Sequence, residues 1–324
     1  MLLSKRMSGL SNLFRWRNGP EGVNPVRPVG PGEIEPALRL ILGRSGVRSD
    51  SAHAAEFEAL AAARGIDLSA MHVSVVGRRL VAASLRVSNV AGTSMIMLST
   101  AGASRATALA CASCAHASAI ELLDRGAQMV QVLIEATEAQ LDQHLHERGF
   151  THVATLVYLQ RHSFETPAPQ LPADLQLVRY SPLTHALFAR TIEQSYVDSL
   201  DCPALHDRRS IDDVIAGHKA AGEHDPNLWH CVVDAQGNGL GVLLLSVVGQ
   251  QQGMELIYLG LPRAARGQGI GDFLMNQALY VTYAQALPNL TLAVDSGNTP
   301  ALKLYQRHRM IEIHRRIALM LTRA

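Results

Sequence analysis

The sequence of 324 residues has few cysteines, no excess of charge of one sign and no long apolar run. Its four cysteines are too few for a disulfide framework at this length, so a reducing cytoplasm is the expected setting. Lysine and arginine total 29 against 28 for aspartate and glutamate, which argues against a nucleic-acid-binding protein. No stretch resembles a signal peptide or reaches the roughly 18 apolar residues of a membrane span. We therefore expect a cytoplasmic globular protein without a membrane partner.

Metal-binding patterns are missing too. The fourteen histidines are dispersed and form no H-E-x-x-H cluster. Cys111 and Cys114 form a C-x-x-C pair, but they lie in an alanine-rich stretch with no second pair nearby. Small core residues are therefore favoured over a metal site, and no metal cofactor is expected.

Proline marks the clearest seam in the chain. The segment 164–172 (FETPAPQLP) contains three prolines, which neither a helix nor a sheet ladder accommodates at this density. A second group of prolines, Pro28–Pro31 (PVGP), ends a flexible, mildly basic tail. The expected division is a flexible tail over 1–30, a first domain over 31–163, a linker over 164–172 and a second domain over 173–324. Two domains also suit a chain of this length.

Hydrophobic periodicity predicts the elements of the second domain. Strands are expected at 175–180, 228–233, 240–248, 254–261 and 290–294, with a pair of short strands across 310–321. Helices are expected at 183–199, 211–221, 271–286 and 299–307. Three consecutive strands between helices indicate a mixed α+β fold rather than regular alternation.

The first domain repeats this plan. Helices are expected at 32–43, 105–125 and 138–148, and strands at 71–76, 80–87, 93–98, 129–135 and 152–159. The shared order suggests duplication, although few residues match between the halves.

The strongest chemical signal is the segment Leu256–Gly271 (LIYLGLPRAARGQGIG), in which a glycine loop joins an apolar strand to a helix. Backbone amides at a helix N-terminus lack partners and attract phosphate. Gly269 and Gly271 let the backbone approach a ligand, and Arg263 and Arg266 add cationic donors. The glycine spacing fits neither the dinucleotide fingerprint nor the Walker loop. The alternative is a turn with spare glycines.

A second signal lies in the segment NTPALKLY. Asn298, Ala301 and Tyr305 share one helical face, and Pro300 places the helix start near Thr299. A tyrosine held over a thiolate leaving group is a suitable general acid. Considered alone, Tyr305 is more often a packed aromatic residue.

Together, the two segments resemble motifs A and B of the GNAT superfamily of acyl-CoA N-acyltransferases. Motif A, R/Q-x-x-G-x-G/A after an apolar strand, is matched by Arg266, Gly269 and Gly271. Motif B, N-x-x-A-x-x-L/F-Y, is matched by Asn298, Ala301, Leu304 and Tyr305. The resemblance covers residues 173–324 and implies an α+β fold with two GNAT-like domains, each a mixed, mostly antiparallel sheet flanked by helices.

The resemblance also implies roles for these residues. Acetyl-CoA would be the co-substrate, with its pyrophosphate on the amides of 266–271 and its pantetheine arm along the end of the strand. Tyr305 would be the general acid, and Asn298 would contact the pantetheine or order its helix. The residues expected to bind the cofactor are Leu259, Gly260, Leu261, Arg266, Gly267, Gln268, Gly269, Ile270, Gly271 and Asn298.

Direct attack requires a neutral amine, so a base is needed. Glu255 stands at the start of the cofactor strand, where some family members place such a base, and burial would raise its pKa. An ordinary surface glutamate is an equal alternative, and His230 and Tyr258 are less favoured bases. Acceptor specificity would come from 183–226, a region that includes Glu193, Tyr196, Asp198, Asp201 and Asp213. Several carboxylates near a cleft would favour a cationic amine, although a solvated acidic face is the more common explanation.

The first domain departs from the family pattern. Where the glycine loop is expected, residues 99–106 read STAGASRA, and 137–149 lacks the motif B asparagine and tyrosine. This half therefore resembles a degenerate copy that packs on the active domain and shapes the acceptor cleft. The internal pseudo-dimer leaves a monomer or a homodimer possible.

The favoured function is transfer of acetyl from acetyl-CoA to a small-molecule or peptide amine by direct attack. A longer acyl group or a thiol-precursor acceptor, as in mycothiol synthase, is the alternative among enzymes. A non-catalytic acyl-CoA-binding or regulatory module is the alternative outside them.

Overall fold

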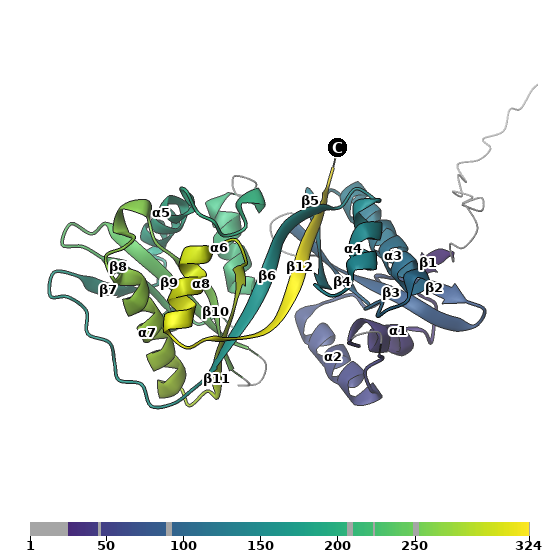
Figure 1. The fold of residues 1–324 in the computed structure, drawn as a ribbon, viewed down its shortest axis with the longest axis horizontal. Coiled ribbons are helices and arrows are strands. Elements are labelled where there is room, and N and C mark those ends of the chain that lie inside the picture. The colour runs from purple at the N-terminus through teal and green to yellow at the C-terminus, as the bar shows by residue number, and fades with distance from the viewer. Residues whose placement is uncertain are drawn as a thin grey trace, which may run out of the picture.

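The computed structural model describes residues 25–44, 47–88, 93–205, 210–222, 224–248 and 253–323 (Figure 1). Twelve strands form one continuous sheet in the order β1-β2-β3-β4-β5-β12-β6-β11-β10-β9-β8-β7. The strands are β1 Val26–Pro28, β2 Met71–Val76, β3 Arg79–Ser88, β4 Thr93–Leu98, β5 Met129–Glu135, β6 Thr151–His162, β7 Gln176–Arg179, β8 Trp229–Val233, β9 Gly239–Val248, β10 Gly253–Gly260, β11 Asn289–Asp295 and β12 Ile311–Thr322.

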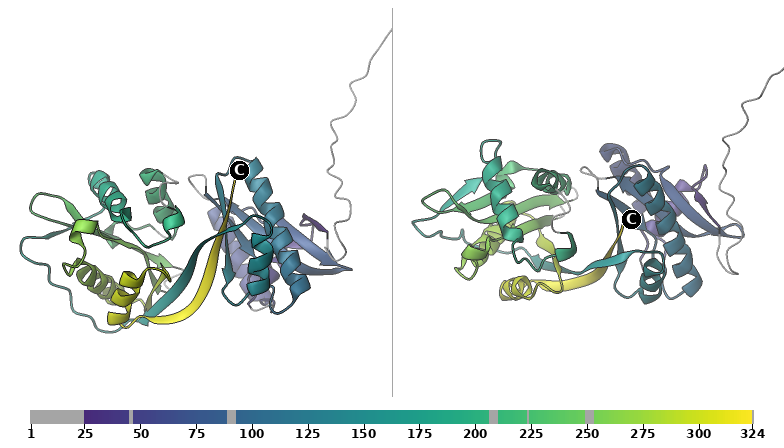
Figure 2. Two further views of the ribbon diagram at one scale, coloured as in Figure 1. Left: turned by 45° about the horizontal axis from the view of Figure 1, so that its top comes forward. Right: turned by 90° about the horizontal axis from the view of Figure 1, so that it is seen from above.

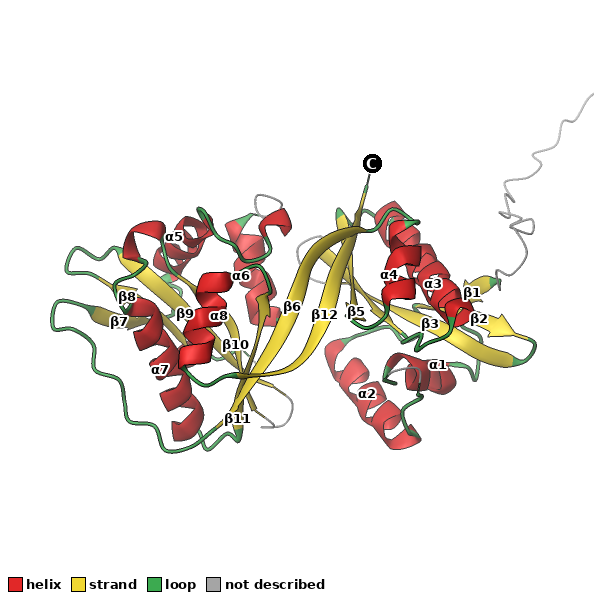
Figure 3. Cartoon of the chain, viewed as in Figure 1, coloured by secondary structure: helices red, strands yellow, loops and turns green. Residues whose placement is uncertain are grey.

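Helices cover both faces of each half of the sheet (Figure 3). In the first half, α3 and α4 lie on one face and α1 and α2 on the other; in the second half, α7 and α8 lie opposite α5 and α6 (Figure 2). The helices are α1 Ile34–Ile41, α2 Ser51–Arg64, α3 Arg105–Asp124, α4 Ala139–His146, α5 His185–Tyr196, α6 Ile211–Ala220, α7 Ile270–Ala284 and α8 Thr299–Arg307, with short 3-10 turns η2 Pro203–Leu205, η3 Pro226–Leu228 and η4 Arg263–Ala265.

The two halves of the sheet have the same construction. Reading inward from the edges, β1-β2-β3-β4-β5-β12 corresponds to β7-β8-β9-β10-β11-β6. In each half the fourth and fifth strands pair in parallel, β4 with β5 and β10 with β11, and the other pairs are antiparallel. The duplication predicted from element order is therefore present in the sheet topology.

The last strand of each half completes the sheet of the other half. β6 follows α4 in the chain, but it lies between β12 and β11. β12 ends the chain, but it lies between β5 and β6, where Leu319 faces Val132 and is fully buried in the core of the first half. Conversely, Val157 and Leu159 of β6 belong to the core of the second half. The domain boundaries drawn at the prolines remain a prediction. The sheet is continuous across them, because β6 before the linker pairs with β11 and β12 after it.

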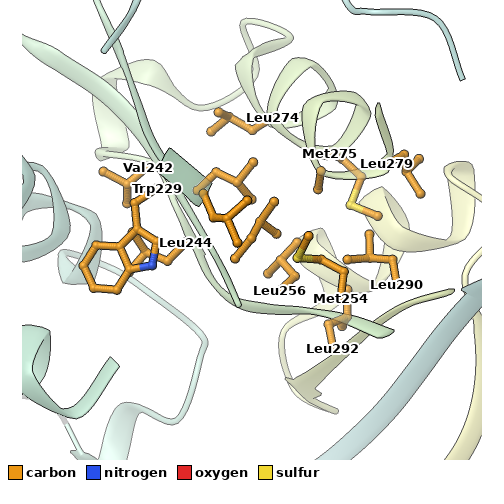
Figure 4. Packing of buried hydrophobic residues seen from close by; sticks show 14 of the residues in the cluster. Trp229, Val242, Leu244, Met254, Leu256, Leu274, Met275, Leu279, Leu290 and Leu292 are labelled. Atoms are coloured by element: carbon orange, nitrogen blue, oxygen red, sulfur yellow. The ribbon is translucent and has the colours of Figure 1, made fainter. Parts of the chain in front are cut away.

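The cores differ in side-chain size. In the second half, Met254 on β10, Leu290 on β11 and Met275 on α7 meet beneath the helix, with Trp229 across the sheet (Figure 4). In the first half, the buried residues of α3, which packs on the sheet, are mostly small. Cys111 and Cys114 are among them and are fully buried, as expected. Burial raises the pKa of the Cys111 thiol to about 12, so it stays protonated.

Four expectations need correction. Residues 1–30 were expected to be a flexible tail, but β1 within that range pairs with β2 from Val26↔Ser74 to Pro28↔His72. Residues 310–321 were expected to form two short strands, but β12 is one long strand. It is continuous because it pairs with β5 of the first half on one side and with β6 on the other. α2 was not predicted, because its fourteen residues bury little more than Ala54 and Ala61 and so show no clear period. α3 is long and apolar enough to cross a membrane, contrary to expectation, yet it packs against β3 and α4.

The exchange of β6 and β12 predicts that the halves stay together when the linker is cut. A protease site engineered into residues 165–171 would yield one fragment ending after β6 and another beginning before β7. The pairings β5·β12, β12·β6 and β6·β11 all join the two fragments, so they should co-elute in native size-exclusion chromatography. Separation only in denaturant is the matching control; separation under native conditions would contradict the exchange.

Candidate active site

The site is built where two parallel strands diverge. β10 and β11 pair only from Met254↔Leu290 to Leu256↔Leu292. Past this point β10 shifts register by one residue and continues along β9, while β11 continues along β6 to Asp295. The side of β10 that faces β11 is therefore left without a ladder partner over its last residues, and an extended ligand can pair with such an edge.

A cavity of about 430 Å³ opens at this divergence, within the size range of small-molecule sites. The end of β10, the glycine loop, α8 and the segment after α5 line it. The predicted site residues that line it are Leu259, Gly260, Leu261, Arg266, Gly267, Gly269, Gly271, Asn298 and Tyr305. Glu255, Gln268 and Ile270 were also predicted but are not among its lining residues.

The glycine loop has the backbone that the sequence predicts. Gly267 and Gly269 have φ of 76° and 82°, in the left-handed region that favours glycine. Gly269 is the N-cap of α7 and has no side chain to cap the helix, so the amides of the first turn are open to an anion. Buried Ile270 fixes the helix start from below, and the exposed Gln268 side chain donates to the Ala264 carbonyl.

Arg266 ties the loop to α5, a role that the sequence did not reveal. It was expected to be a cationic donor for phosphate. Instead its guanidinium donates to the carbonyl oxygens of Leu261 (3.1 Å), Asp198 (3.1 Å), Ser195 (3.0 Å) and Val197 (2.8 Å). Ser195 lies in the last turn of α5, Val197 is its C-cap and Asp198 is the next residue, so the cation also complements the helix dipole.

Gly260 is required by a close side-chain approach. A Cβ there would lie 2.6 Å from Ser195 Oγ and 2.7 Å from the Tyr258 hydroxyl. Those two hydroxyls are themselves 2.6 Å apart, and the Ser195 hydroxyl donates to the Ile192 carbonyl. Tyr258 was a minor candidate for the base, but burial raises its pKa far above the usual range, so it remains a neutral hydroxyl.

Tyr305 lies on α8 with only 5% of its surface exposed, and that surface belongs to the cavity wall. Burial, with a smaller contribution from the negative charge of Asp201, raises its pKa well above the usual range. The hydroxyl therefore keeps its proton, as a general acid must. Asn298 accepts a hydrogen bond from the Ala301 amide (3.3 Å), so its side chain orders the helix that carries Tyr305.

The segment after α5 contributes carboxylates to the cavity wall. Asp198 and Asp201 line it, and Asp201 Oδ1 accepts from the amide of Asp295 (3.4 Å). The buried Asp295 in turn accepts from the amide of Cys202 (3.2 Å). Burial and these two neighbouring carboxylates raise the pKa of the Cys202 thiol to about 12, which favours the thiol over the thiolate. Cys202 follows Asp201 in the chain but does not line the cavity.

The candidate bases lie in different surroundings. Burial raises the pKa of Glu255 on β10, as expected for a base, although Glu255 does not line the cavity. His230 is buried on β8, where burial lowers its pKa to about 4. A histidine of that pKa is a weak base, so His230 is disfavoured. Within the part of the chain described, no three His, Cys, Asp or Glu side chains are grouped to hold a metal.

Comparison with known proteins identifies this arrangement. Residues 192–309, which hold the divergence, the loop and α8, match the Acetyltransferase (GNAT) family. The family match therefore lies within the second half, from α5 through α8. The chain is also 26% identical over 196 residues to a mycothiol acetyltransferase of Jonesia denitrificans, an alignment that covers 58% of this chain and 61% of the relative. It thus spans less than two thirds of that relative's length.

Solved structures show a similar fold over more than nine tenths of the chain. A GCN5-related N-acetyltransferase from Sphaerobacter thermophilus covers 94% of this chain and 96% of its own, with a TM-score of 0.67 and 18% identity. A tandem GNAT protein from the clavulanic acid biosynthesis pathway covers 92% and 98%, with a TM-score of 0.55 and 12% identity. These likenesses confirm the predicted α+β fold and the tandem GNAT arrangement.

The clamp formed by Arg266 predicts a stability effect that charge alone does not explain. Arg266→Lys should lower the free energy of unfolding by about 1–2 kcal/mol, because an ammonium cannot reach the carbonyls that the planar guanidinium joins. Arg263→Lys is the control, since its ion pair with Asp198 is exposed and should contribute little. Urea denaturation measures both. Equal values for the two variants would contradict the clamp.

Proposed function

We propose that the second half transfers an acetyl group from acetyl-CoA to a primary amine by direct attack. The observation that carries this proposal is the meeting of three features at one cavity: the unpaired edge of β10, the open amides at the start of α7 and the buried hydroxyl of Tyr305. A binding module would have no use for the third feature. The GNAT match and the relative named as an acetyltransferase support the reaction class.

The residues present suit acetyl-CoA. The amides of residues 267–271 would hold its pyrophosphate, since they lie at a helix N-terminus that no side chain caps. The free edge of β10 at residues 258–260 would pair with the amide groups of the pantetheine arm. Bound there, acetyl-CoA supplies an activated thioester carbonyl beside Tyr305. Arg266 acts indirectly by holding the loop and the end of α5 in register.

The placement of the cysteines supports direct attack. An acyl-cysteine route needs a thiolate at the cavity, but no described cysteine lines it, and burial raises the pKa of Cys202, which follows Asp201 in the chain, to about 12. The amine would therefore attack the thioester while Tyr305 protonates the leaving sulfur. An ammonium carries no lone pair, so a carboxylate must first take its proton. We assign the reception of the ammonium to Asp201 and retain Glu255, whose pKa burial raises, as the base acting through water.

The acceptor is an amine that a carboxylate-lined wall would attract. Asp198 and Asp201 stand on the cavity wall contributed by the region that the sequence analysis linked to specificity. The mycothiol acetyltransferase relative favours a thiol-precursor amine as a second candidate acceptor.

Loss of the general acid should slow chemistry and spare binding. Tyr305→Phe should lower kcat by about 10²–10⁴-fold, because the leaving thiolate then lacks its proton donor. The affinity for acetyl-CoA, measured by calorimetric titration, should change less than about twofold, since only one hydroxyl is removed. Thiol release from acetyl-CoA over a panel of primary amines measures the rate.

Tyr283→Phe is the matched control, because Tyr283 is an exposed tyrosine on α7. An undiminished rate in Tyr305→Phe would exclude Tyr305 as the acid. Failure of the unaltered protein to bind acetyl-CoA near 1:1 would exclude the proposed donor.

The glycine loop offers a second test with a matched control. Gly269→Ala and Gly237→Ala both place a Cβ at positive φ, 82° and 80°, and neither Cβ would contact another atom within 4 Å. Each should therefore cost about 1 kcal/mol of stability. Only Gly269→Ala should weaken acetyl-CoA binding, by about tenfold or more, because relaxation of its backbone moves the amides that hold the pyrophosphate. Equal affinities in calorimetry would exclude the loop as the pyrophosphate site.

A further inference from the structure

The first half contains the counterpart of the glycine loop. Residues 99–104 join β4 to α3 as residues 261–269 join β10 to α7, and in both halves this connection follows the strand that pairs in parallel with the next. The helix after the fifth strand also corresponds, α4 to α8. Its N-cap is Glu138 in the first half and Asn298 in the second. Glu138 thus stands at the position of Asn298.

The two N-cap side chains point to different partners. Asn298 caps its own helix through the Ala301 amide. Glu138 does not cap α4; its Oε1 accepts from the amides of Ala101 (2.5 Å) and Gly102 (3.3 Å) in the loop across the sheet end. Glu138 is only 6% exposed, so this is a buried carboxylate on backbone amides rather than a surface contact. These hydrogen bonds lower the pKa of Glu138, but burial is the larger effect and raises it, so they offset only part of the cost of burying the charge.

Two further side chains distinguish the first half from the site in the second half. The first turn of α3 is capped by Ser104, whose Oγ accepts from the Thr107 amide (3.2 Å), where α7 has the side-chain-free Gly269. Seven residues after Glu138 stands the fully buried Leu145, as Tyr305 stands seven residues after Asn298. The first half thus has an aliphatic side chain at the position of the proposed acid.

We propose that the first half retains an anion-binding loop whose permanent occupant is the Glu138 carboxylate, so that this half is closed to the pyrophosphate of acyl-CoA. The carboxylate takes two amide hydrogen bonds of the kind that a phosphate would take. Because it is covalently attached, it competes at a high effective concentration with any dissolved anion. Removing the carboxylate should reopen the loop to a free anion.

Hydrogen exchange read by mass spectrometry tests this in the full-length protein. In Glu138→Ala the amides of the 99–104 peptide should exchange about tenfold faster, because two hydrogen bonds are lost. Millimolar inorganic pyrophosphate should restore their protection in this variant and leave the same peptide of the unaltered protein unchanged. Glu147→Ala is the control: Glu147 lies at the opposite, C-terminal end of α4, and its exposed carboxylate pairs with His144 and accepts from the Gln143 side chain.

Glu138→Gln distinguishes loss of the carboxylate from unfolding of the first half, because the glutamine side-chain oxygen can still accept a hydrogen bond. Its 99–104 peptide should exchange faster than in the unaltered protein while β4 and β5 stay protected. The proposal is overturned if Glu138→Ala leaves the peptide protected, if pyrophosphate fails to restore protection, or if β4 and β5 open in both variants. Pyrophosphate protection of the 266–271 peptide is read in the same experiment, so failure of the proposed function is recorded separately.

Discussion

The exchange of β6 and β12 is the constraint on which the rest of the structure depends. β11 can leave β10 and open the cavity because its other side is paired along its full length with β6, from Asn289↔His162 to Asp295↔Leu156. Without that partner, the diverging end of β11 would carry unsatisfied backbone groups on both sides. The wall of the site in the second half is therefore supported by β6, which precedes the linker in the sequence. Removing the first half would remove that support.

The same arrangement of strands and helices therefore supports different loops in the two halves. In both halves the fourth and fifth strands are parallel, and a loop leads from the fourth strand to a long helix. In the second half this loop has glycines at positive φ and a helix start without a cap, so its amides are open. In the first half the Glu138 carboxylate accepts from the Ala101 and Gly102 amides of the loop, and the Ser104 side chain caps α3. The difference between an open and a closed copy therefore depends on few side chains, while the sheet that supports them is shared.

Local pattern predicted most elements because their signals are local. The bounds of β2, β4, β5 and α8 agree with the sequence prediction, since turn residues and changes of apolar period mark their ends. The exchange of strands could not be predicted, because β6 and β12 are equally apolar and nothing within either one specifies its neighbours. The same limit applies to the Glu138 contact, which joins residues more than thirty positions apart. Most residues named from the family motifs do line the cavity, while their roles remain predictions, and Asp201 was noted only as one of several carboxylates.

Arg266 shows that a sequence motif can predict where a residue lies in the fold without predicting what its side chain contacts. Its position in the loop suggested a phosphate ligand, and its charge supported that reading. The structure instead uses its planar guanidinium to join the loop to the end of α5. The segment that leaves α5 carries Asp198 and Asp201, which line the wall assigned here to the amine. One cation therefore fixes the amides proposed for the donor relative to the carboxylates proposed for the acceptor. Direct transfer needs the two substrates held at a fixed separation, and this contact is what the chain provides for it.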